Sequence, residues 1–155
     1  MAKILFILRN KSVASPDYTA TIESGVALST YFLATALQSN LDVQTTVVGI
    51  TDPSDIPHVV NVNNPTHVVI ETFWIEPDVL APIKLQYPTI KWIVRDHSES
   101  CFRVFEPNAF GWIVDYLKYG FEVMSNSPKS ANDVEGIAVA AGQDATLATY
   151  GPNVY

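Results

Sequence analysis

The fold is decided by residues 65–99, which read PTHVVIETFWIEPDVLAPIKLQYPTIKWIVRDHSE. Two apolar segments, Thr66–Ile70 and Thr89–Val94, are rich in β-branched residues and predict strands of a sheet that is covered on both faces. We expect a helix from Pro77 to Gln86 between them, because proline is favoured in the first turn of a helix. A strand, a helix and a second strand in this order predict a crossover unit with two parallel strands.

The same alternation continues on both sides of this unit. Further strands are expected at Ile4–Leu8, Val43–Ile50, Phe121–Met124 and Ala145–Thr149. Further helices are expected at residues 25–39, from Ser54 or Asp55 to before Pro65, and at residues 108–119 and 128–140, with Ser24, Asn108 and Ser127 as N-caps. Residues 9–22 and 96–105 are expected to be loops. The alternation predicts an α/β fold, a Rossmann-like three-layer sandwich with a mainly parallel sheet, and residues 1–155 form a single domain.

Composition excludes several classes of partner. The 155 residues carry 16 acidic and 9 basic side chains, which give a net charge of −7 at pH 7. Such a surface repels a phosphate backbone, so we expect no nucleic-acid partner. No stretch approaches the roughly 20 apolar residues that cross a bilayer, and Ile4–Leu8 is too short for a secretory signal, so no membrane association is expected. Cys101 is the only cysteine, which excludes an intrachain disulfide and favours a reducing compartment.

The motifs of several common enzyme classes are absent from the sequence. The chain has no GxxxxGK[ST] loop and no GxGxxG after its first predicted strand, which disfavours P-loop nucleotidases and ordinary dinucleotide enzymes. Ser98 does not lie in a GxSxG elbow, which disfavours an α/β-hydrolase. His58, His67 and His97 lack the spacing of metal ligands, so no metal or other cofactor is expected.

Candidate functional residues follow the predicted strands, since ligands of an open parallel sheet bind beyond the carboxyl ends of its strands. This rule selects Arg9, Glu71 with Trp74, and the polar run Arg95–Glu99. Within that run, His97 lies beside carboxylates and an arginine, a setting that suits a base or the binding of a polyol or phosphate. The alternative is a solvated loop whose charges pair with each other.

Two further features have both a binding and a structural interpretation. Gly25 follows Ser24 at the start of a predicted helix, where backbone N–H groups can meet an anionic or hydroxyl-rich ligand, or the glycine merely eases packing. Trp74 and Phe102 follow strand ends and are candidates to stack on a sugar ring or to contact another chain. Most of the other aromatic residues are expected in the core.

Five segments carry a resemblance to a known family. They are KILFILR (3–9), SGVALSTYFLATAL (24–37), PTHVVIETFWIEPDVL (65–80), YPTIKWIVRDHSES (87–100) and YGPNVY (150–155). Together they resemble the N-terminal half of glycosyltransferase-like proteins encoded by tailed bacteriophages. Those proteins are similar to GT-B enzymes, in which two Rossmann-like domains face each other across a cleft.

The resemblance implies roles for individual residues. The implied substrate-binding residues on the acceptor side are Ser24, Gly25, Glu71, Trp74, Arg95 and Ser98. The implied catalytic residues are His97, as the base for the acceptor hydroxyl, and Glu99 or Asp96, as the partner that orients it. The donor-binding half of a GT-B enzyme has no counterpart in the 155 residues, so we expect the domain to be inactive alone. Its expected ligand is a saccharide or a nucleotide-sugar.

Three interpretations of such a half stay open. The chain is an excised fragment of an enzyme, or a natural half-enzyme that works with a second subunit. Alternatively, it is a non-enzymatic structural or interaction domain that self-associates or binds virion proteins, because a fold does not fix a function. The enzymatic interpretations place the protein in the host cytoplasm, and the structural one places it in the virion.

Overall fold

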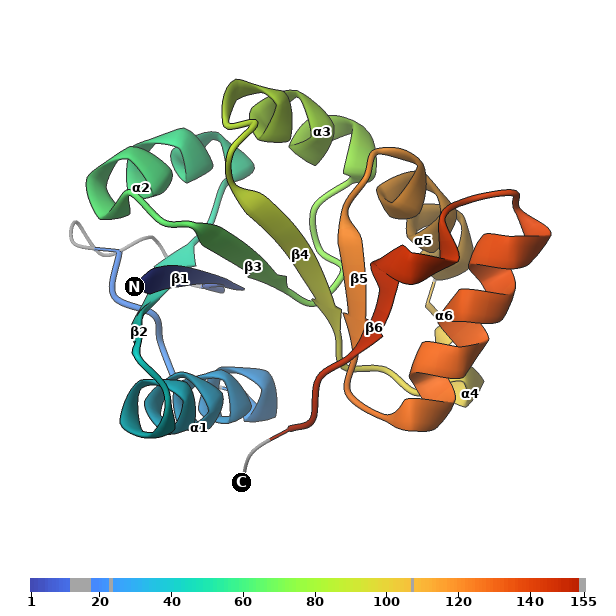
Figure 1. Ribbon diagram of the computed structural model, residues 1–155, viewed down its shortest axis with the longest axis horizontal. Coiled ribbons are helices and arrows are strands. Elements are labelled where there is room, and N and C mark those ends of the chain that lie inside the picture. The colour runs from blue at the N-terminus through green and yellow to red at the C-terminus, as the bar shows by residue number, and fades with distance from the viewer. Residues whose placement is uncertain (12–17, 23, 107, 154–155) are drawn as a thin grey trace.

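The structure is a computed structural model that describes residues 1–11, 18–22, 24–106 and 108–153 (Figure 1). The strands in these residues are β1 (Ala2–Arg9), β2 (Val43–Ile50), β3 (His67–Glu71), β4 (Lys91–Asp96), β5 (Glu122–Ser125) and β6 (Ala148–Tyr150). The α-helices are α1 (Gly25–Asn40), α2 (Ile56–Asn63), α3 (Pro77–Gln86), α4 (Ser100–Arg103), α5 (Ala109–Lys118) and α6 (Pro128–Ala140). The short 3₁₀ helices η1 (Pro53–Asp55) and η2 (Ala145–Leu147) precede α2 and β6.

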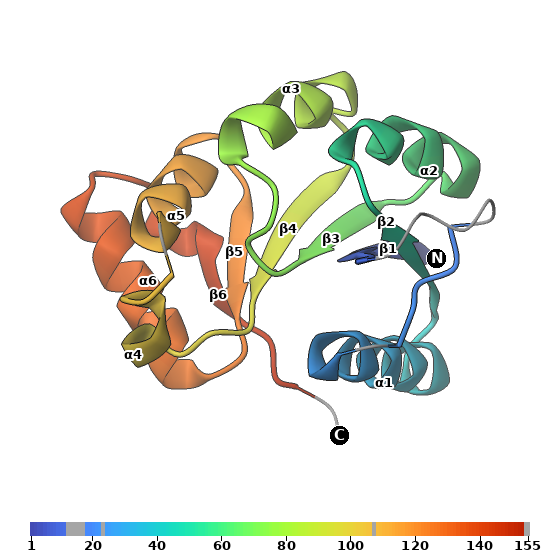
Figure 2. The ribbon, with the colours of Figure 1, turned by 180° about the vertical axis from the view of Figure 1, so that it is seen from behind.

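The strands form one parallel sheet in the order β2-β1-β3-β4-β5-β6. This confirms the expected α/β fold, a Rossmann-like three-layer arrangement around a parallel sheet. The strand order is of the flavodoxin-like type, in which the direction of winding reverses between β1 and β3. Because crossovers between parallel strands are right-handed, α1 lies on one face of the sheet and α2, α3, α5 and α6 lie on the other (Figures 1 and 2).

Both faces of the sheet bury apolar side chains, and alternate residues of a strand serve opposite faces. On the α1 face, Phe6, Val69 and Ile93 pack together with Ala34 of α1. The larger core on the other face combines strand residues with residues of four helices, among them Leu5, Val68, Trp92, Ile56, Leu80, Ile113 and Val134. This burial on both faces explains why the central strands are continuous apolar runs in the sequence.

The two helices that were expected to have a serine N-cap, α1 and α6, begin directly after that serine. The Ser24 hydroxyl accepts a hydrogen bond from the Ala27 backbone N–H (3.2 Å), and the Ser127 hydroxyl accepts one from that of Ser130 (3.1 Å). Asn108 also precedes a helix, but its side chain makes no capping hydrogen bond and its backbone is left-handed (φ 67°). Among the described residues, no helix has the length and apolar character that crossing a membrane requires.

Several boundaries differ from the expected ones. A turn closed by the Ile90 N–H and the Tyr87 carbonyl (3.1 Å) delays the start of β4, and pairing with β5 extends the strand through Asp96. The expected loop 96–105 contains α4. The expected strand 145–149 begins with η2, because the Asp144 carboxylate accepts a hydrogen bond from the Thr146 N–H (2.9 Å). In the expected loop 9–22, Arg9 belongs to β1 and residues 12–17 lie outside the described residues.

The end of β1 is fixed by Asn10, a buried polar residue that lies against Gly49 of β2. The Asn10 amide donates to the Thr19 carbonyl (3.2 Å), and its oxygen accepts from the Thr21 N–H (3.2 Å). A Cβ atom on Gly49 would lie 2.1 Å from that oxygen, closer than real contacts allow. Glycine at position 49 therefore provides the space in which the Asn10 amide organises the loop after β1.

Replacing Gly49 by alanine is expected to lower the free energy of unfolding by about 1–3 kcal/mol, because the added methyl group displaces the bonded Asn10 side chain. Urea unfolding monitored by circular dichroism measures this change. Gly25→Ala is the matched control, since a Cβ atom at that position meets nothing within 4 Å. Equal destabilisation by the two variants would contradict the role assigned to Gly49.

Candidate functional site

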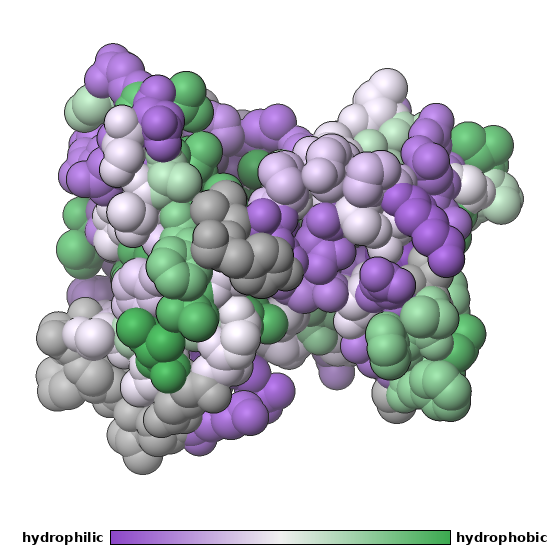
Figure 3. Space-filling model, turned by 90° about the horizontal axis from the view of Figure 1, so that it is seen from below, coloured by the Kyte–Doolittle hydropathy of each residue, from purple (hydrophilic) through white to green (hydrophobic). Residues whose placement is uncertain are grey.

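A cleft of about 1260 Å³ opens at the carboxyl edge of the sheet. Its walls come from the end of β1, from residues 72–74 after β3 and from residues 96–98 at the end of β4. These segments meet where the strand order reverses between β1 and β3, the usual place for a ligand in an open parallel sheet. Seen from below, the molecule is hollowed between the lobe with α1 and the lobe with α4 and α6, and hydrophilic residues flank the hollow (Figure 3).

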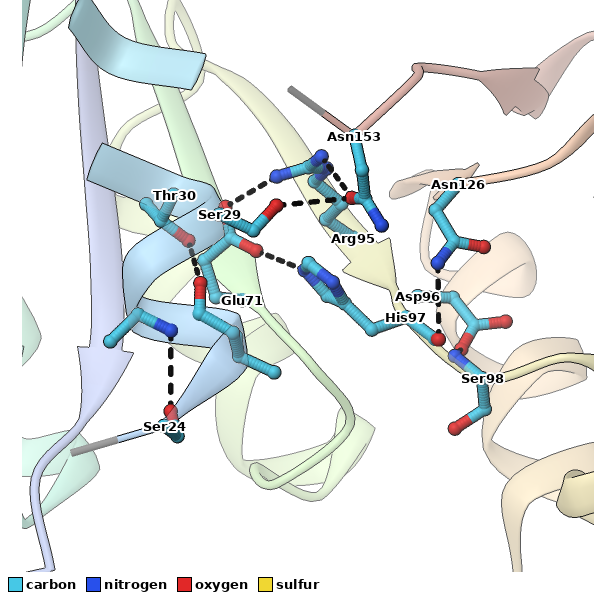
Figure 4. Close-up of polar contacts among 12 residues, drawn as sticks. Ser24, Ser29, Thr30, Glu71, Arg95, Asp96, His97, Ser98, Asn126 and Asn153 are labelled. Atoms are coloured by element: carbon cyan, nitrogen blue, oxygen red, sulfur yellow. Dashed lines mark hydrogen bonds and ion pairs between the residues drawn. The ribbon is translucent and has the colours of Figure 1, made fainter. Parts of the chain in front are cut away.

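Glu71 is the central polar residue of the site. It ends β3 and is 1% exposed. One carboxylate oxygen, Oε2, lies 2.5 Å from His97 Nε2, and the other, Oε1, lies 3.3 Å from Arg95 Nη1 (Figure 4). A buried carboxylate is costly unless it is paired, so these two contacts compensate its burial. The structure thus brings Glu71, Arg95 and His97 together, as their positions at the ends of adjacent strands led us to expect.

Arg95 supports Glu71 from the neighbouring strand. Its side chain is fully buried, and Nη2 donates to the Pro152 carbonyl (3.2 Å) and to Asn153 Oδ1 (2.8 Å). The Ser29 hydroxyl of α1 donates to the same Asn153 oxygen (3.2 Å; Figure 4). Arg95 does not line the cleft, which corrects the expectation that it contacts a substrate. Its guanidinium instead positions Glu71 and joins it to the C-terminal segment.

His97 lines the cleft together with the buried carboxylate of Glu71. Its side chain is 11% exposed, and it lines the cleft beside Ser98. The Asn126 amide donates to the His97 carbonyl (3.1 Å), which holds the backbone at this position. In the neutral ring Nε2–H donates to Glu71, and Nδ1 then carries the lone pair. Among the described residues Nδ1 has no hydrogen-bond partner, so it is available as a proton acceptor.

Asp96 and Glu99 do not orient His97, which corrects the expectation that one of them does. The Asp96 side chain faces the other side of β4, where it pairs with Arg103 and accepts a hydrogen bond from the Ser98 N–H (2.9 Å). Burial raises the pKa of the Asp96 carboxyl, and the Arg103 guanidinium opposes that shift. Glu99 is exposed, precedes α4 and does not line the cleft. Glu71 is therefore the partner of His97.

Trp74 is an aromatic residue of the cleft wall that follows β3. Trp74 lines the cleft, and the guanidinium carbon of Arg9 lies 5.8 Å from the centre of its ring. Between Glu71 and Trp74, the backbone of Thr72 is left-handed (φ 72°), a strained conformation for a β-branched residue. The Thr72 N–H donates to the Arg95 carbonyl (2.9 Å), which keeps the turn against β4. The strained turn places the Trp74 ring at the cleft.

The remaining sequence candidates divide between the cleft and its surroundings. Ser24 lines the cleft, although its hydroxyl also caps α1, and Ser98 lines it while donating to Glu106 Oε1 (2.7 Å). Gly25 and Phe102 do not line it, and Phe102 is exposed on α4. Within the described part of the chain, no group of three His, Cys, Asp or Glu side chains is arranged to hold a metal ion.

Several residues of the site were missed in the sequence. Asn10 and Thr72 lie two residues beyond the expected strands Ile4–Leu8 and Thr66–Ile70, next to the selected Arg9 and Glu71, so the same rule could have included them. Asn126 likewise follows β5. No sequence pattern predicts the contacts of Asn153 and Ser29, because these contacts depend on where the C-terminal segment lies relative to α1. Asn153 accepts hydrogen bonds from Arg95 and from Ser29.

Comparisons with known proteins leave the family of the chain open. No family model matches the sequence, and no curated protein matches it. A LuxR-family two-component response regulator from Aurantimonas sp. SI85-9A1 is similar in structure, with a TM-score of 0.49, 11% identity and coverage of 91% of this chain and 85% of that chain. A cobalamin-binding protein from Desulfitobacterium hafniense DCB-2 has a TM-score of 0.44 and 14% identity, with coverage of 90% of this chain and 57% of that chain. Likeness at this level carries no argument about function.

Replacing Glu71 by glutamine is expected to lower the free energy of unfolding by about 3 kcal/mol, because the buried Arg95 guanidinium loses its counter-charge. Urea unfolding measures the loss. Glu99→Gln makes the same chemical change at an exposed position and is expected to shift stability by less than about 0.5 kcal/mol. Adding Arg95→Met to Glu71→Gln should recover part of the loss. A Glu71→Gln variant as stable as the wild type would contradict the pairing.

Proposed function

We propose that this domain binds a saccharide in the cleft and that His97, backed by Glu71, accepts a proton from one of its hydroxyl groups. In this role the domain is equivalent to the acceptor-side half of a GT-B glycosyltransferase, as the resemblance to phage glycosyltransferase-like proteins implies. The observation that carries the proposal is the 2.5 Å contact between the buried Glu71 carboxylate and His97 Nε2 at the wall of the cleft. A histidine oriented by a buried carboxylate is a common arrangement for a general base.

The proton transfer follows from the tautomer that Glu71 selects. Nε2–H donates to the carboxylate, so the lone pair of Nδ1 takes the hydroxyl proton. The resulting imidazolium is stabilised by the adjacent negative charge of Glu71. The freed oxygen then bonds to the anomeric carbon of a donor sugar as the bond from that carbon to the leaving group breaks. The donor is held by a second domain or subunit, so the domain alone binds the acceptor without transferring sugar to it.

Trp74 supplies the second element that a sugar site needs. The apolar face of a pyranose ring packs on aromatic rings, and Trp74 lies in the cleft wall formed after β3. The contribution of Trp74 to binding therefore comes from the surface of its ring that lines the cleft.

Isothermal titration with a panel of saccharides and nucleotide-sugars tests the proposal. At least one saccharide should bind, and His97→Ala and Trp74→Ala should each weaken that binding about tenfold or more, since each removes a contact of the ligand. His58→Ala is the matched control, because His58 is exposed and lies outside the cleft. Absence of heat with every compound, or equal binding by the His97 and His58 variants, would overturn the proposal.

We propose, as a second candidate, that the protein is a non-enzymatic interaction domain that associates with a second copy of itself through α1. The 16 residues of α1 carry no charged side chain, although the chain has a net charge of −7. Leu28 and Phe32 lie one helical turn apart and are 45% and 43% exposed. An uncharged apolar face lets two copies of an acidic protein meet there without charge repulsion.

Replacing Leu28 by aspartate is expected to convert a dimer into a monomer, because it places a negative charge at the centre of the α1 contact. Size-exclusion chromatography with light scattering measures the mass of each variant. Leu85→Asp is the matched control, since Leu85 is 78% exposed on α3, across the sheet from α1. A wild-type protein that stays monomeric across the concentration range would remove this candidate.

A further inference from the structure

We infer that the saccharide bound in the cleft carries an anionic group and that Arg9 and Lys11 bind it. This inference rests on the proposed function and adds the chemical class of the ligand. Arg9 ends β1 and Lys11 follows it, and both side chains line the cleft. They are exposed, so a ligand can reach them without a change in the fold.

The argument begins with the distribution of basic residues. The chain has nine of them, and four lie in the cleft or directly behind it. Arg95 and Arg103 are buried and paired with Glu71 and Asp96, so their charges are already neutralised. Arg9 and Lys11 have no carboxylate within ion-pair distance among the described residues. Two cations that form no ion pair within the described part of the chain, in one cleft of a protein with a net charge of −7, favour a negatively charged ligand.

The cleft separates its charges, which gives a ligand one orientation. The cations lie on the wall from β1. The carboxylate of Glu106 accepts a hydrogen bond from the hydroxyl of Ser98 (2.7 Å), which follows β4, and β3 separates β4 from β1 in the sheet. A sugar whose anionic group faces β1 therefore directs hydroxyl groups toward Ser98 and His97. The reverse orientation places the anion beside Glu106, where like charges repel.

Arg9 also has the geometry for a planar anion. Its guanidinium carbon lies 5.8 Å from the centre of the Trp74 ring, so the charged group and the aromatic surface are neighbours in the cleft. A guanidinium donates two parallel hydrogen bonds to a carboxylate or a phosphoryl group. A sugar ring packed on Trp74 thus brings a substituent at its edge within reach of Arg9, and Lys11 adds a second positive charge.

The experiment compares three sugars that share a ring. D-glucose is neutral, D-glucuronate carries a carboxylate and glucose 6-phosphate carries a phosphoryl group. Their dissociation constants are measured by titration of the full chain at low and at high salt. We expect at least one of the anionic sugars to bind about tenfold more tightly than glucose at low salt, with the ratio falling as salt screens the charges. The anionic sugar with the lower dissociation constant shows whether the site prefers a carboxylate or a phosphoryl group.

Arg9→Gln and Lys11→Gln should each reduce the preference for the anionic sugar over glucose about fivefold to tenfold. Lys118→Gln removes the same charge from an exposed side chain at the end of α5, outside the cleft, and should change nothing. Equal affinities for all three sugars, or a preference that survives both cleft variants, would overturn the inference and leave the proposed function standing. Failure of all three sugars, while another saccharide of the wider panel binds equally well to the wild type and to both cleft variants, would also overturn the inference alone, and failure of the whole panel would overturn both.

Discussion

The carboxylate of Glu71 is the interaction on which the carboxyl edge of the sheet depends. An ionised group with 1% exposure needs compensation from both of its oxygens, and it receives this from Arg95 and His97. Arg95 in turn donates to Pro152 and Asn153, and Asn153 accepts from Ser29 of α1. One buried charge thereby links β3 and β4 to helix α1 and to the C-terminal segment. The stability of this edge and the orientation of the candidate base have the same origin.

Most of the fold followed from the sequence because buried parallel strands leave a simple signature, a short apolar run between turn residues. The strand order left no such signature. Apolar periodicity records which faces of a strand are buried, but it does not record whether β3 returns beside β1 or lies beyond β2. That choice matters here, because placing β3 next to β1 brings Arg9 at the end of β1 beside Trp74, which follows β3, in one cleft.

The run Arg95–Glu99 shows why the site was only partly predictable. Successive residues of a strand point to opposite faces, and β4 continues through Asp96, two residues past its expected end. Arg95 therefore faces Glu71, whereas Asp96 faces Arg103. With residues 96–99 expected to be a loop, Asp96 and Glu99 were equal candidates to orient His97. The structure excludes Asp96, because the pleat of β4 turns its side chain away from His97. Asn153 lies 58 residues from Arg95 in the chain, and no local pattern connects them.

The placement of positive charge bears on the proposal that the site performs one half of a transfer reaction. Deprotonating a hydroxyl needs a base beside it, whereas expelling a leaving group needs cations or N–H groups where negative charge develops. Arg95 and Arg103 cannot serve that second need, because Glu71 and Asp96 already neutralise them. Arg9 and Lys11 line the cleft at the end of β1. Under the proposed function, their charge acts on the acceptor sugar that is bound there. Under the proposed function, stabilisation of the leaving group must therefore come from a second domain or subunit that faces the cleft.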